Sequence, residues 1–435
     1  MNTPGDDYHA LLARHDAMRL RRRILAPADT RTDRWTAEAP RAYDGTADQL
    51  LISDALPLVA PMEDLIADLY RVLFERHPYL RALFPESMAF QQDHLASIFH
   101  YLIGNLHHTD ELIRVFGQLG RDHRKLGVRP AQFGAFEEAL IEALRLRAGI
   151  RWTGALEDAW LRMLHLAVSA MVRGADEAIS EPPSWEATVT SHELRAPGLA
   201  VLRVRPHQPY TFAAGQYASL ESPLLEQAWR PYYLARAPHP DGELEFHVRA
   251  RGAGGVSDAL VHGTRTGGTV RLGAPRGALA LPDHLLSADL LLIASGTGWA
   301  PMKALLQRID ADRSGVHRVR LLLGHGGPGS AGEEMYDAAG LEAFRRNRPW
   351  LTVVTADAGG ARFEDTGARS PARQHAFVAL SPEAAGTTGA GPEQEVVARL
   401  AAAGIPQTHL HLDTAGRGTV TGRSASTTRT GLLSA

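Results

Sequence analysis

The spacing of the apolar residues changes at Glu181-Pro182-Pro183, and this change constrains the fold more than any other feature of the sequence. Before it, apolar residues recur every three or four positions, as Leu156, Trp160 and Met163 do. This period is typical of helices with one buried face. Because no β-type alternation of useful length occurs in residues 48–180, we predict an all-helical domain there.

Residues 184–285 have the pattern of β-structure. In Glu243–Arg249, apolar Leu244 and Phe246 alternate with polar neighbours, which predicts a strand with one buried and one solvated side. Glycine and proline recur at short intervals through the same region. We therefore expect a small antiparallel β-barrel over residues 184–285.

Residues 288–413 alternate strand-like runs with helical patterns. The first run, Leu290–Ala294, ends in Ser295-Gly296-Thr297-Gly298 and is followed by a helical pattern. Further strand-like runs occur at Val319–Leu323, Leu351–Val354, Ala376–Leu380 and His409–Leu412. Strands that alternate with helices predict an α/β domain with a parallel sheet.

The two ends of the chain differ from these three domains. Residues 1–47 contain a short, basic, amphipathic helical pattern, which we interpret as a helix that packs on the next domain. Binding to an acidic surface or partner is the alternative. Residues 414–435 are rich in threonine, serine, glycine and arginine and are expected to be a disordered tail.

Composition excludes several classes of protein and of site. The absence of cysteine rules out disulfides, cysteine-ligated zinc, iron–sulfur clusters and a thiolate nucleophile. The net charge of −3 gives no reason to expect a nucleic-acid partner. We see no signal peptide and no apolar run long enough for a membrane span, so we expect a cytoplasmic protein.

A candidate metal ligand, His123, lies in Leu119–Val128 of the helical domain. A single histidine on a helix is weak evidence for a metal site, but Tyr70, Phe84 and Gln91 precede it at a characteristic joint spacing. This pattern resembles the globin of the flavohaemoglobin family. The resemblance implies that His123 is the proximal ligand of haem b and that Phe84 packs on the porphyrin. Tyr70 and Gln91 would line the distal face, with Leu95 as its apolar wall.

The chemistry of these residue types agrees with the implied roles. One neutral imidazole leaves the sixth position of the iron open for oxygen. A phenol such as Tyr70 can donate a hydrogen bond to bound oxygen, whose outer atom carries negative charge.

The expected barrel contains Trp229–Ala235, preceded by Gly215-Gln216-Tyr217 and followed by His247–Ala250 and Gly254–Ser257. In this order the segments resemble the FAD-binding barrel of the ferredoxin–NADP reductase family. The resemblance implies that Arg230 binds the FAD pyrophosphate, that Tyr232 packs on the flavin, and that backbone N–H groups near Gly255 bind phosphate. The expected FAD contacts are Gln216, Tyr217, Arg230, Tyr232, Tyr233, His247, Arg249, Gly255, Val256 and Ser257.

The turn Gly296–Gly298 follows a buried strand and begins a helix, and the sequence after it matches the same reductase family through Met302. Peptide dipoles at such a helix start favour a pyrophosphate. We expect a nicotinamide nucleotide here, and a side chain at Gly298 to collide with its pyrophosphate. The expected contacts are Gly296, Thr297, Gly298, Pro301 and Met302. The absence of arginine around His325-Gly326-Gly327 favours NADH but leaves NADPH open.

The sequence departs from the family pattern at several positions. Behind the proximal histidine, Phe133 replaces a tyrosine and Ala175 replaces a glutamate, so His123 is expected to lack an acidic partner. Tyr233 replaces the serine beside the reactive edge of the flavin, and Leu380-Ser381-Pro382 replaces Cys-Gly-Pro. These departures most resemble the actinobacterial-type variants of the family.

The resemblance implies an oxidoreductase in which NADH or NADPH reduces FAD, FAD reduces haem, and nitric oxide and O2 become nitrate. One alternative is a flavohaem enzyme with an organic donor such as a hydroxy acid, or a peroxide acceptor. A second is a haem-based gas sensor or oxygen-binding protein with a decayed reductase. We expect a monomer or homodimer.

Overall fold

A computed structural model of the chain describes residues 43–312, 318–324, 335–346, 348–356, 371–380 and 392–412. The chain divides into two units, Met1–Pro183 and Ser184–Ala435. The expected N-terminal helix falls almost wholly outside the described residues, as do the expected tail, the segment His325-Gly326-Gly327, and Ser381 and Pro382.

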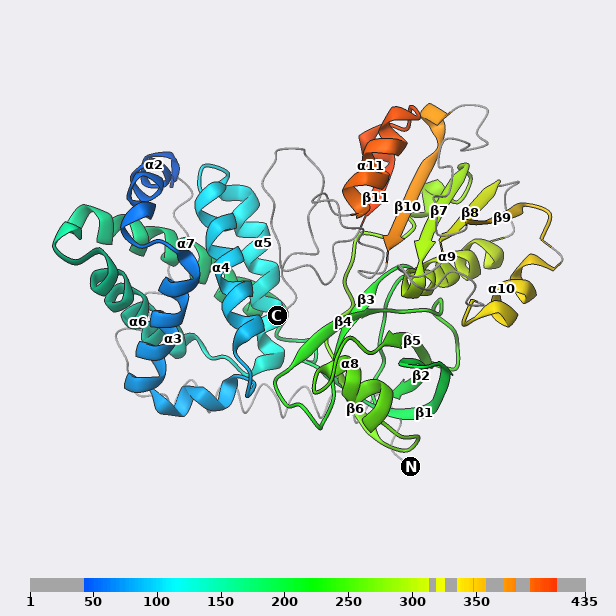
Figure 1. The fold of residues 1–435 in the computed structure, drawn as a ribbon, viewed down its shortest axis with the longest axis horizontal. Helices are drawn as coiled ribbons and strands as arrows, with labels where there is room; N and C mark the ends of the chain where they lie inside the picture. The colour runs from blue at the N-terminus through cyan, green and yellow to red at the C-terminus, as the bar shows by residue number, and fades with distance from the viewer. Residues whose placement is uncertain are drawn as a thin grey trace. The chain divides into compact units, whose positions relative to one another are not determined.

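The first unit is helical, as the spacing of its apolar residues predicted (Figure 1). Proline at the first position of α6 fixes a helical φ where its missing N–H is not needed. The side chain of Thr153 caps α7 by accepting the N–H of Leu156 at 3.3 Å. The main helices are α2 (Thr46–Ala55), α3 (Met62–Arg76), α4 (Ala89–Gly104), α5 (Thr109–His123), α6 (Pro130–Ala148) and α7 (Gly154–Glu177). None of the helices described is both long and apolar enough to cross a lipid bilayer.

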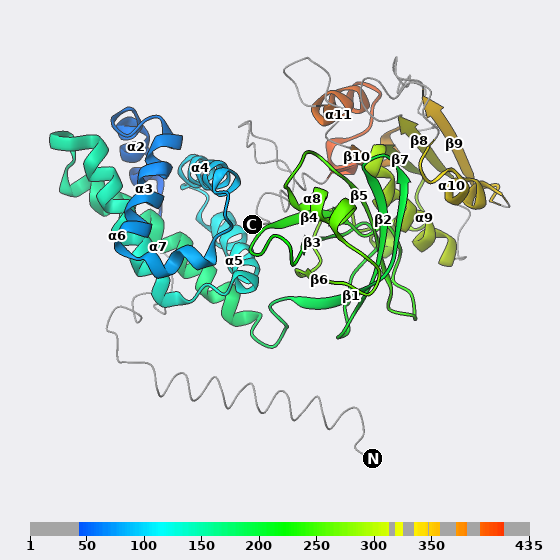
Figure 2. The ribbon, with the colours of Figure 1, turned by 60° about the horizontal axis from the view of Figure 1, so that its bottom comes forward.

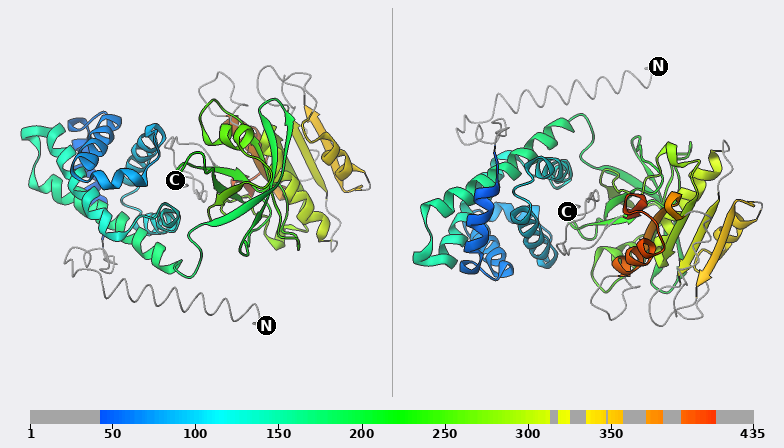
Figure 3. Two further views of the ribbon diagram at one scale, coloured as in Figure 1. Left: turned by 90° about the horizontal axis from the view of Figure 1, so that it is seen from below. Right: turned by 90° about the horizontal axis from the view of Figure 1, so that it is seen from above.

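The second unit begins with an antiparallel sheet whose described strands run in the order β4-β3-β6-β1-β2-β5. The two outer strands approach one another at a bridge between Leu234 and Phe246, which curls the sheet toward a barrel (Figure 3). Its inner side chains form one apolar core that includes Phe246 and Val248. The strands are β1 (Trp185–Ala196), β2 (Leu199–Pro206), β3 (Tyr217–Glu221), β4 (Trp229–Tyr233), β5 (Leu244–Arg249) and β6 (Thr269–Leu272).

The expectation that β5 has one solvated side is wrong. Glu245 and His247, the polar members of the alternation, are each only 3% exposed. They are buried because Lys303 of helix α9 (Trp299–Ala311) and Tyr336 cover this side of the strand. The alternation placed the apolar side correctly, but it could not report what packs on the other side.

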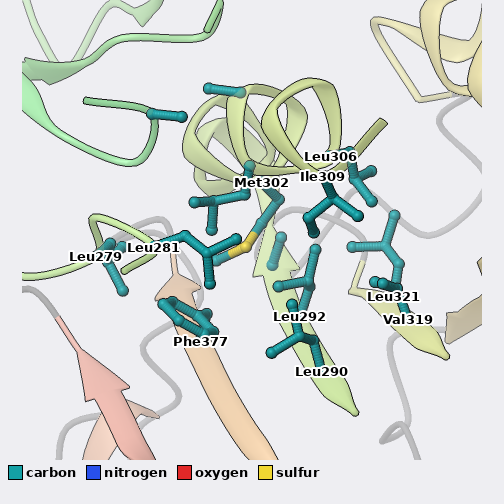
Figure 4. Close-up of a cluster of buried hydrophobic side chains, with 14 of the residues drawn as sticks. Leu279, Leu281, Leu290, Leu292, Met302, Leu306, Ile309, Val319, Leu321 and Phe377 are labelled. Atoms are coloured by element: carbon teal, nitrogen blue, oxygen red, sulfur yellow. The ribbon is translucent and has the colours of Figure 1, made fainter. Parts of the chain in front are cut away.

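The second sheet of this unit is parallel, with described strands in the order β11-β10-β7-β8-β9. Helix α9 and helix α10 (Ala338–Arg345) pack on one face, in a core that includes Leu292, Met302 and Phe377 (Figure 4). Helix α11 (Pro392–Ala402) packs on the other face, as Figure 2 also shows. The strands are β7 (Leu290–Ser295), β8 (Val319–Gly324), β9 (Leu351–Ala356), β10 (His375–Leu380) and β11 (Leu410–Leu412). The predicted fold class of three successive architectures is confirmed.

Stacked histidines join β11 to β10. The ring of His411 lies 4.2 Å from that of Phe377, and its Nε2 lies 3.2 Å from Nδ1 of His375. His409 stacks on His375 at a ring separation of 4.0 Å. Burial, together with the neighbouring histidines, lowers the pKa of His411 to about 4.

We predict that acid destabilises this unit through His411. The folded-state pKa lies below the value of about 6.5 expected for an unfolded chain, so the unfolded state binds more protons as the pH falls. The free energy of unfolding should therefore fall between pH 6.5 and 4. His411→Phe keeps the stack on Phe377 and should flatten this dependence in denaturant titrations. The same change at the exposed His239 is the control, and an equally steep pH dependence in both variants would refute the assignment.

Candidate functional site

His123 ends helix α5, and its ring is held by a bond within the helix. Nδ1 lies 3.0 Å from the carbonyl oxygen of Leu119. A carbonyl only accepts hydrogen bonds, so Nδ1 carries the proton and Nε2 presents a lone pair. Burial lowers the pKa of His123, which keeps the imidazole neutral at pH 7. A neutral imidazole with an available Nε2 is the form that binds iron.

Glycines fix the position of α5 against α7. A Cβ atom at Gly120 would overlap the carbonyl oxygen of Met171, and one at Gly174 would overlap that of Gly117. The two helices therefore cross with their backbones in contact, three residues before His123. The sequence analysis missed this crossing, although glycines inside helical patterns are a signal of close packing.

Tyr70 lies in an aromatic cluster with Phe74 and Phe84. Its ring centre is 5.9 Å from that of Phe74 and 5.5 Å from that of Phe84. The side chain is buried, and burial raises the pKa of its hydroxyl, so the group stays protonated as a donor. Among the described residues, this hydroxyl has no hydrogen-bond partner. A donor that has no partner in the protein can give its hydrogen bond to a ligand.

Gln91 provides a second polar group of this kind. Its side chain extends from the first turn of α4, and its Oε1 atom is buried without a hydrogen-bond partner among the described residues. Leu95 follows one turn later on the same helix and is half-buried. No hydrogen bond or ring contact in the described chain joins His123 to Tyr70, Phe84 or Gln91.

These features fit the haem implied by the sequence. A neutral imidazole would hold iron. The buried Oε1 atom of Gln91 and the hydroxyl on the buried side chain of Tyr70 lie on other helices, without hydrogen-bond partners among the described residues. Phe84 supplies an aromatic surface beside Tyr70.

Four of the ten residues expected to bind FAD lie on β3 and β4. Tyr217 pairs with Tyr233 across the two strands, with their rings edge to face at 6.0 Å. Tyr232 packs on the barrel core and Tyr233 on the core of the parallel sheet. Arg230 is half-buried on β4, and its Nη1 donates to the carbonyl of Trp229 at 2.8 Å.

Three other expected FAD contacts, Gln216, Arg249 and His247, lie outside β3 and β4 and have different surroundings. Gln216 accepts the N–H of Ala213 through Oε1 at 2.8 Å, and Arg249 ends β5 half-buried. His247 is turned toward Glu245 and Tyr336, so we assign its side chain a packing role in place of a cofactor contact.

The expected phosphate turn is exposed at Gly255, where a short helix, α8 (Val256–Asp258), begins. The side chain of Val256 belongs to the barrel core, so only the backbone of this residue is available to bind a ligand. The hydroxyl of Ser257 accepts the N–H of Arg251 at 3.2 Å. A Cβ atom at Gly255 would meet no atom within 4 Å.

The nucleotide turn Gly296–Gly298 is a short 3-10 turn between β7 and α9. Gly296 has a φ of 52°, a conformation that glycine adopts without strain.

Three of the residues expected to contact the nucleotide have contacts within the protein that were not expected. Pro301 is buried and Met302 lies in the core of the parallel sheet, so their side chains pack. A Cβ atom at Gly298 would collide with the carbonyl oxygen of Ala379 before any ligand is considered.

Comparisons with known proteins cover both units. The family model described as Globin matches residues 67–171, and that described as Oxidoreductase FAD-binding domain matches residues 186–280. A flavohemoprotein of Bacillus subtilis is 24% identical over 56% of this chain and 65% of its own length. A flavohemoglobin structure from Malassezia yamatoensis covers 85% of this chain and 99% of that chain with a TM-score of 0.68. The chain thus joins a globin domain to an FAD-binding oxidoreductase domain and is similar to flavohaemoglobins.

At 17% identity, the likeness to the Malassezia flavohaemoglobin shows a shared fold. The second unit is also similar to stand-alone reductases. The reductase component of the naphthalene 1,2-dioxygenase system of Pseudomonas putida is 35% identical over 43% of this chain and 54% of its own length. The chain thus spans about half to two thirds of the length of these curated relatives.

The departures from the flavohaemoglobin pattern behind His123 have a structural counterpart. Phe133 lies in the first turn of α6, Ala175 is half-buried near the end of α7, and Asp176 is exposed. The backbone carbonyl of Leu119 is therefore the acceptor for Nδ1. A neutral acceptor gives the imidazole less anionic character than a carboxylate does.

We predict that Gly298→Ala destabilises the second unit itself. The added methyl group must displace the backbone of β10, which typically costs about 1–3 kcal/mol. Thermal unfolding and FAD content should both fall, whereas Gly255→Ala, which adds a methyl group in open space, should change neither the unfolding temperature nor the fold. Normal stability with weaker nucleotide binding alone would support a collision with the ligand instead.

We predict that His123→Ala abolishes haem binding and leaves FAD bound, because the two groups belong to different units. Haem is measured by its Soret band and FAD by its release on denaturation. His100→Ala is a matched control, since the exposed His100 also bonds the carbonyl four residues earlier, at 2.9 Å. A Soret band of wild-type intensity in the His123 variant would disprove the assignment.

Proposed function

We propose that this chain is an NADH- or NADPH-dependent flavohaem oxidoreductase that converts nitric oxide and O2 to nitrate. The observation that carries the proposal is the protonated hydroxyl of Tyr70, which belongs to a buried side chain and has no hydrogen-bond partner among the described residues. The similarity to flavohaemoglobins and the neutral form of His123 support it.

Each of the site residues would have a separate binding role. His123 would hold iron through Nε2, and Tyr70 would donate a hydrogen bond to a small polar ligand. Gln91 can accept or donate a second bond there. Arg230 and the turns at Gly255 and Gly296–Gly298 hold the anionic phosphates of FAD and the nucleotide.

When bound, FAD supplies the conversion of a two-electron donor to single electrons, and haem supplies the iron that binds O2. The overall reaction balances as one nitric oxide, one O2 and one electron for each nitrate. One NADH, oxidised to NAD⁺ with release of a proton, therefore serves two turnovers. A function that consumes these nucleotides favours the cytoplasm, where they are held.

A second candidate function is a flavohaem enzyme with a different electron donor or acceptor. Tyr233 favours it, because a bulky ring packed edge to face on Tyr217 replaces the small serine that the family places beside the flavin. Such a ring can restrict the approach of a nicotinamide to the flavin. In that case a hydroxy acid, and not NADH, would reduce the flavin, or a peroxide would accept the electrons. A gas sensor would show neither reaction.

We predict that nucleotide oxidation in air is slow and accelerates many-fold when nitric oxide is added, with two nitric oxide molecules consumed for each NADH. Tyr70→Phe should reduce this acceleration about 5- to 30-fold, which corresponds to the roughly 1–2 kcal/mol of one lost hydrogen bond. Tyr79→Phe, at an exposed position in the same unit, is the control.

Three outcomes separate the candidate functions. If protein with both cofactors shows no nitric-oxide-dependent oxidation of NADH or NADPH, nitric oxide is not its substrate. If a hydroxy acid then reduces the flavin, the second candidate takes its place. If no donor reduces the flavin, the sensor interpretation remains.

A further inference from the structure

A buried ionic network links three segments of the second unit. Lys303 on α9 places its Nζ atom 2.8 Å from Oε1 of Glu245 on β5 and 2.9 Å from Oδ2 of Asp337, which precedes α10. The side chains of Lys303, Glu245 and Asp337 are 14%, 3% and 8% exposed. The lysine therefore lies between two carboxylates that come from the barrel and from the parallel-sheet domain.

The surrounding groups complete the network. Arg203 donates from Nε to Oε2 of Glu245 at 2.9 Å, and the indole N–H of Trp299 donates to Oδ2 of Asp337 at 2.8 Å. His247 contacts Glu245 through Nε2 at 3.1 Å and the Tyr336 hydroxyl through Nδ1 at 2.8 Å. Because a carboxylate only accepts, Nε2 carries the proton and Nδ1 accepts from the tyrosine.

The charges of this group balance. Burial lowers the pKa of His247 and raises that of Tyr336, so both stay neutral. The positive charges of Lys303 and Arg203 then balance the negative charges of Glu245 and Asp337. Such a buried pair adds little net stability, because desolvation cancels much of the attraction, but removal of one partner leaves a buried charge uncompensated. The network therefore acts mainly to fix one relative position of the segments that carry it.

Those segments flank the nucleotide turn. Trp299 follows Gly298 directly and begins α9, and Lys303 lies one turn further along the helix. Glu245 and His247 lie on β5, which leads through Arg249 to the expected phosphate turn at Gly255. The ion pair of Lys303 with Glu245 thus anchors the N-terminal half of α9 to the strand of the barrel that precedes the expected FAD phosphate turn.

We propose that Lys303 is a positioning residue for electron entry, which holds the nucleotide turn at the correct place relative to the FAD barrel through Glu245 and Asp337. The inference rests on the nucleotide-to-FAD part of the proposed function and is independent of nitric oxide. In that step the nicotinamide loses a hydride and is oxidised, and FAD gains the hydride and one solvent proton. Lys303 would act on this step through Glu245 and Asp337, the two carboxylates that it binds.

The test compares Lys303→Met with wild type in anaerobic flavin reduction by NADH and NADPH. A displacement of about 1 Å can cost up to about a hundredfold in rate, so we expect the limiting rate to fall at least about tenfold while FAD content stays at the wild-type level. Hydrogen exchange of residues 296–303 without nucleotide should lose protection. Lys303→Arg, which restores a positive charge between the two carboxylates, should recover most of the rate and of the protection.

The matched control is Arg348→Met. Arg348 binds Asp310, near the other end of α9, through two bonds of 2.8 and 2.6 Å. It should lower stability without lowering the limiting rate. If Lys303→Met fails to retain FAD, Glu245→Gln, which keeps the shape of the side chain, is used in its place and should lower the rate in the same direction.

Two results would overturn the inference: an unchanged limiting rate with unchanged exchange in the Lys303 variant, or an equal fall in rate in the Arg348 control. Failure of the proposed function would be seen in the wild type and not in the variants. If neither nucleotide reduces the flavin of the wild type, electron entry from a nicotinamide is wrong, whereas the exchange of residues 296–303 still reports whether Lys303 anchors the turn.

Discussion

Close contact between backbones, possible only at glycine, determines where both proposed cofactor sites lie. In the globin unit, Gly120 and Gly174 let α5 and α7 cross without an intervening side chain, and His123 follows Gly120 by one turn. In the second unit, Gly298 brings the nucleotide turn against the carbonyl of Ala379 on β10. Its φ of −60° is open to any residue, so space and not backbone conformation requires glycine there.

Burial then determines the chemical state of the groups that these contacts position. The pKa of His123 falls and that of Tyr70 rises, so one ring stays a neutral base and the other a neutral donor. In the second unit, the largely buried Lys303 is paired with two carboxylates, those of Glu245 and Asp337. The two units thus use the same physical effect for a proposed ligand site and for a structural connection.

Much of the molecule could be predicted from local patterns. Helical spacing, alternation and apolar runs predicted the three architectures in order, because each pattern reflects the period of one element. The joint spacing of Tyr70, Phe84, Gln91 and His123 predicted a globin, which the family match over residues 67–171 confirms. The roles of those residues remain predictions. The alternation of apolar and polar residues wrongly predicted that Glu245 and His247 are exposed to solvent, because it shows only that the two sides of β5 differ in polarity.

The sequence by itself determined the order and type of the elements, the resemblance to flavohaemoglobins, and the segments in which cofactor-binding residues are sought. Only the tertiary structure decided that Met302 packs in a core, that Gly298 faces β10, and that Glu245, Lys303 and Asp337 meet. The physical reason is distance along the chain. Periodicity reports on neighbours within a few residues, whereas Glu245 and Lys303 are 58 positions apart and become partners only when the barrel and α9 pack together.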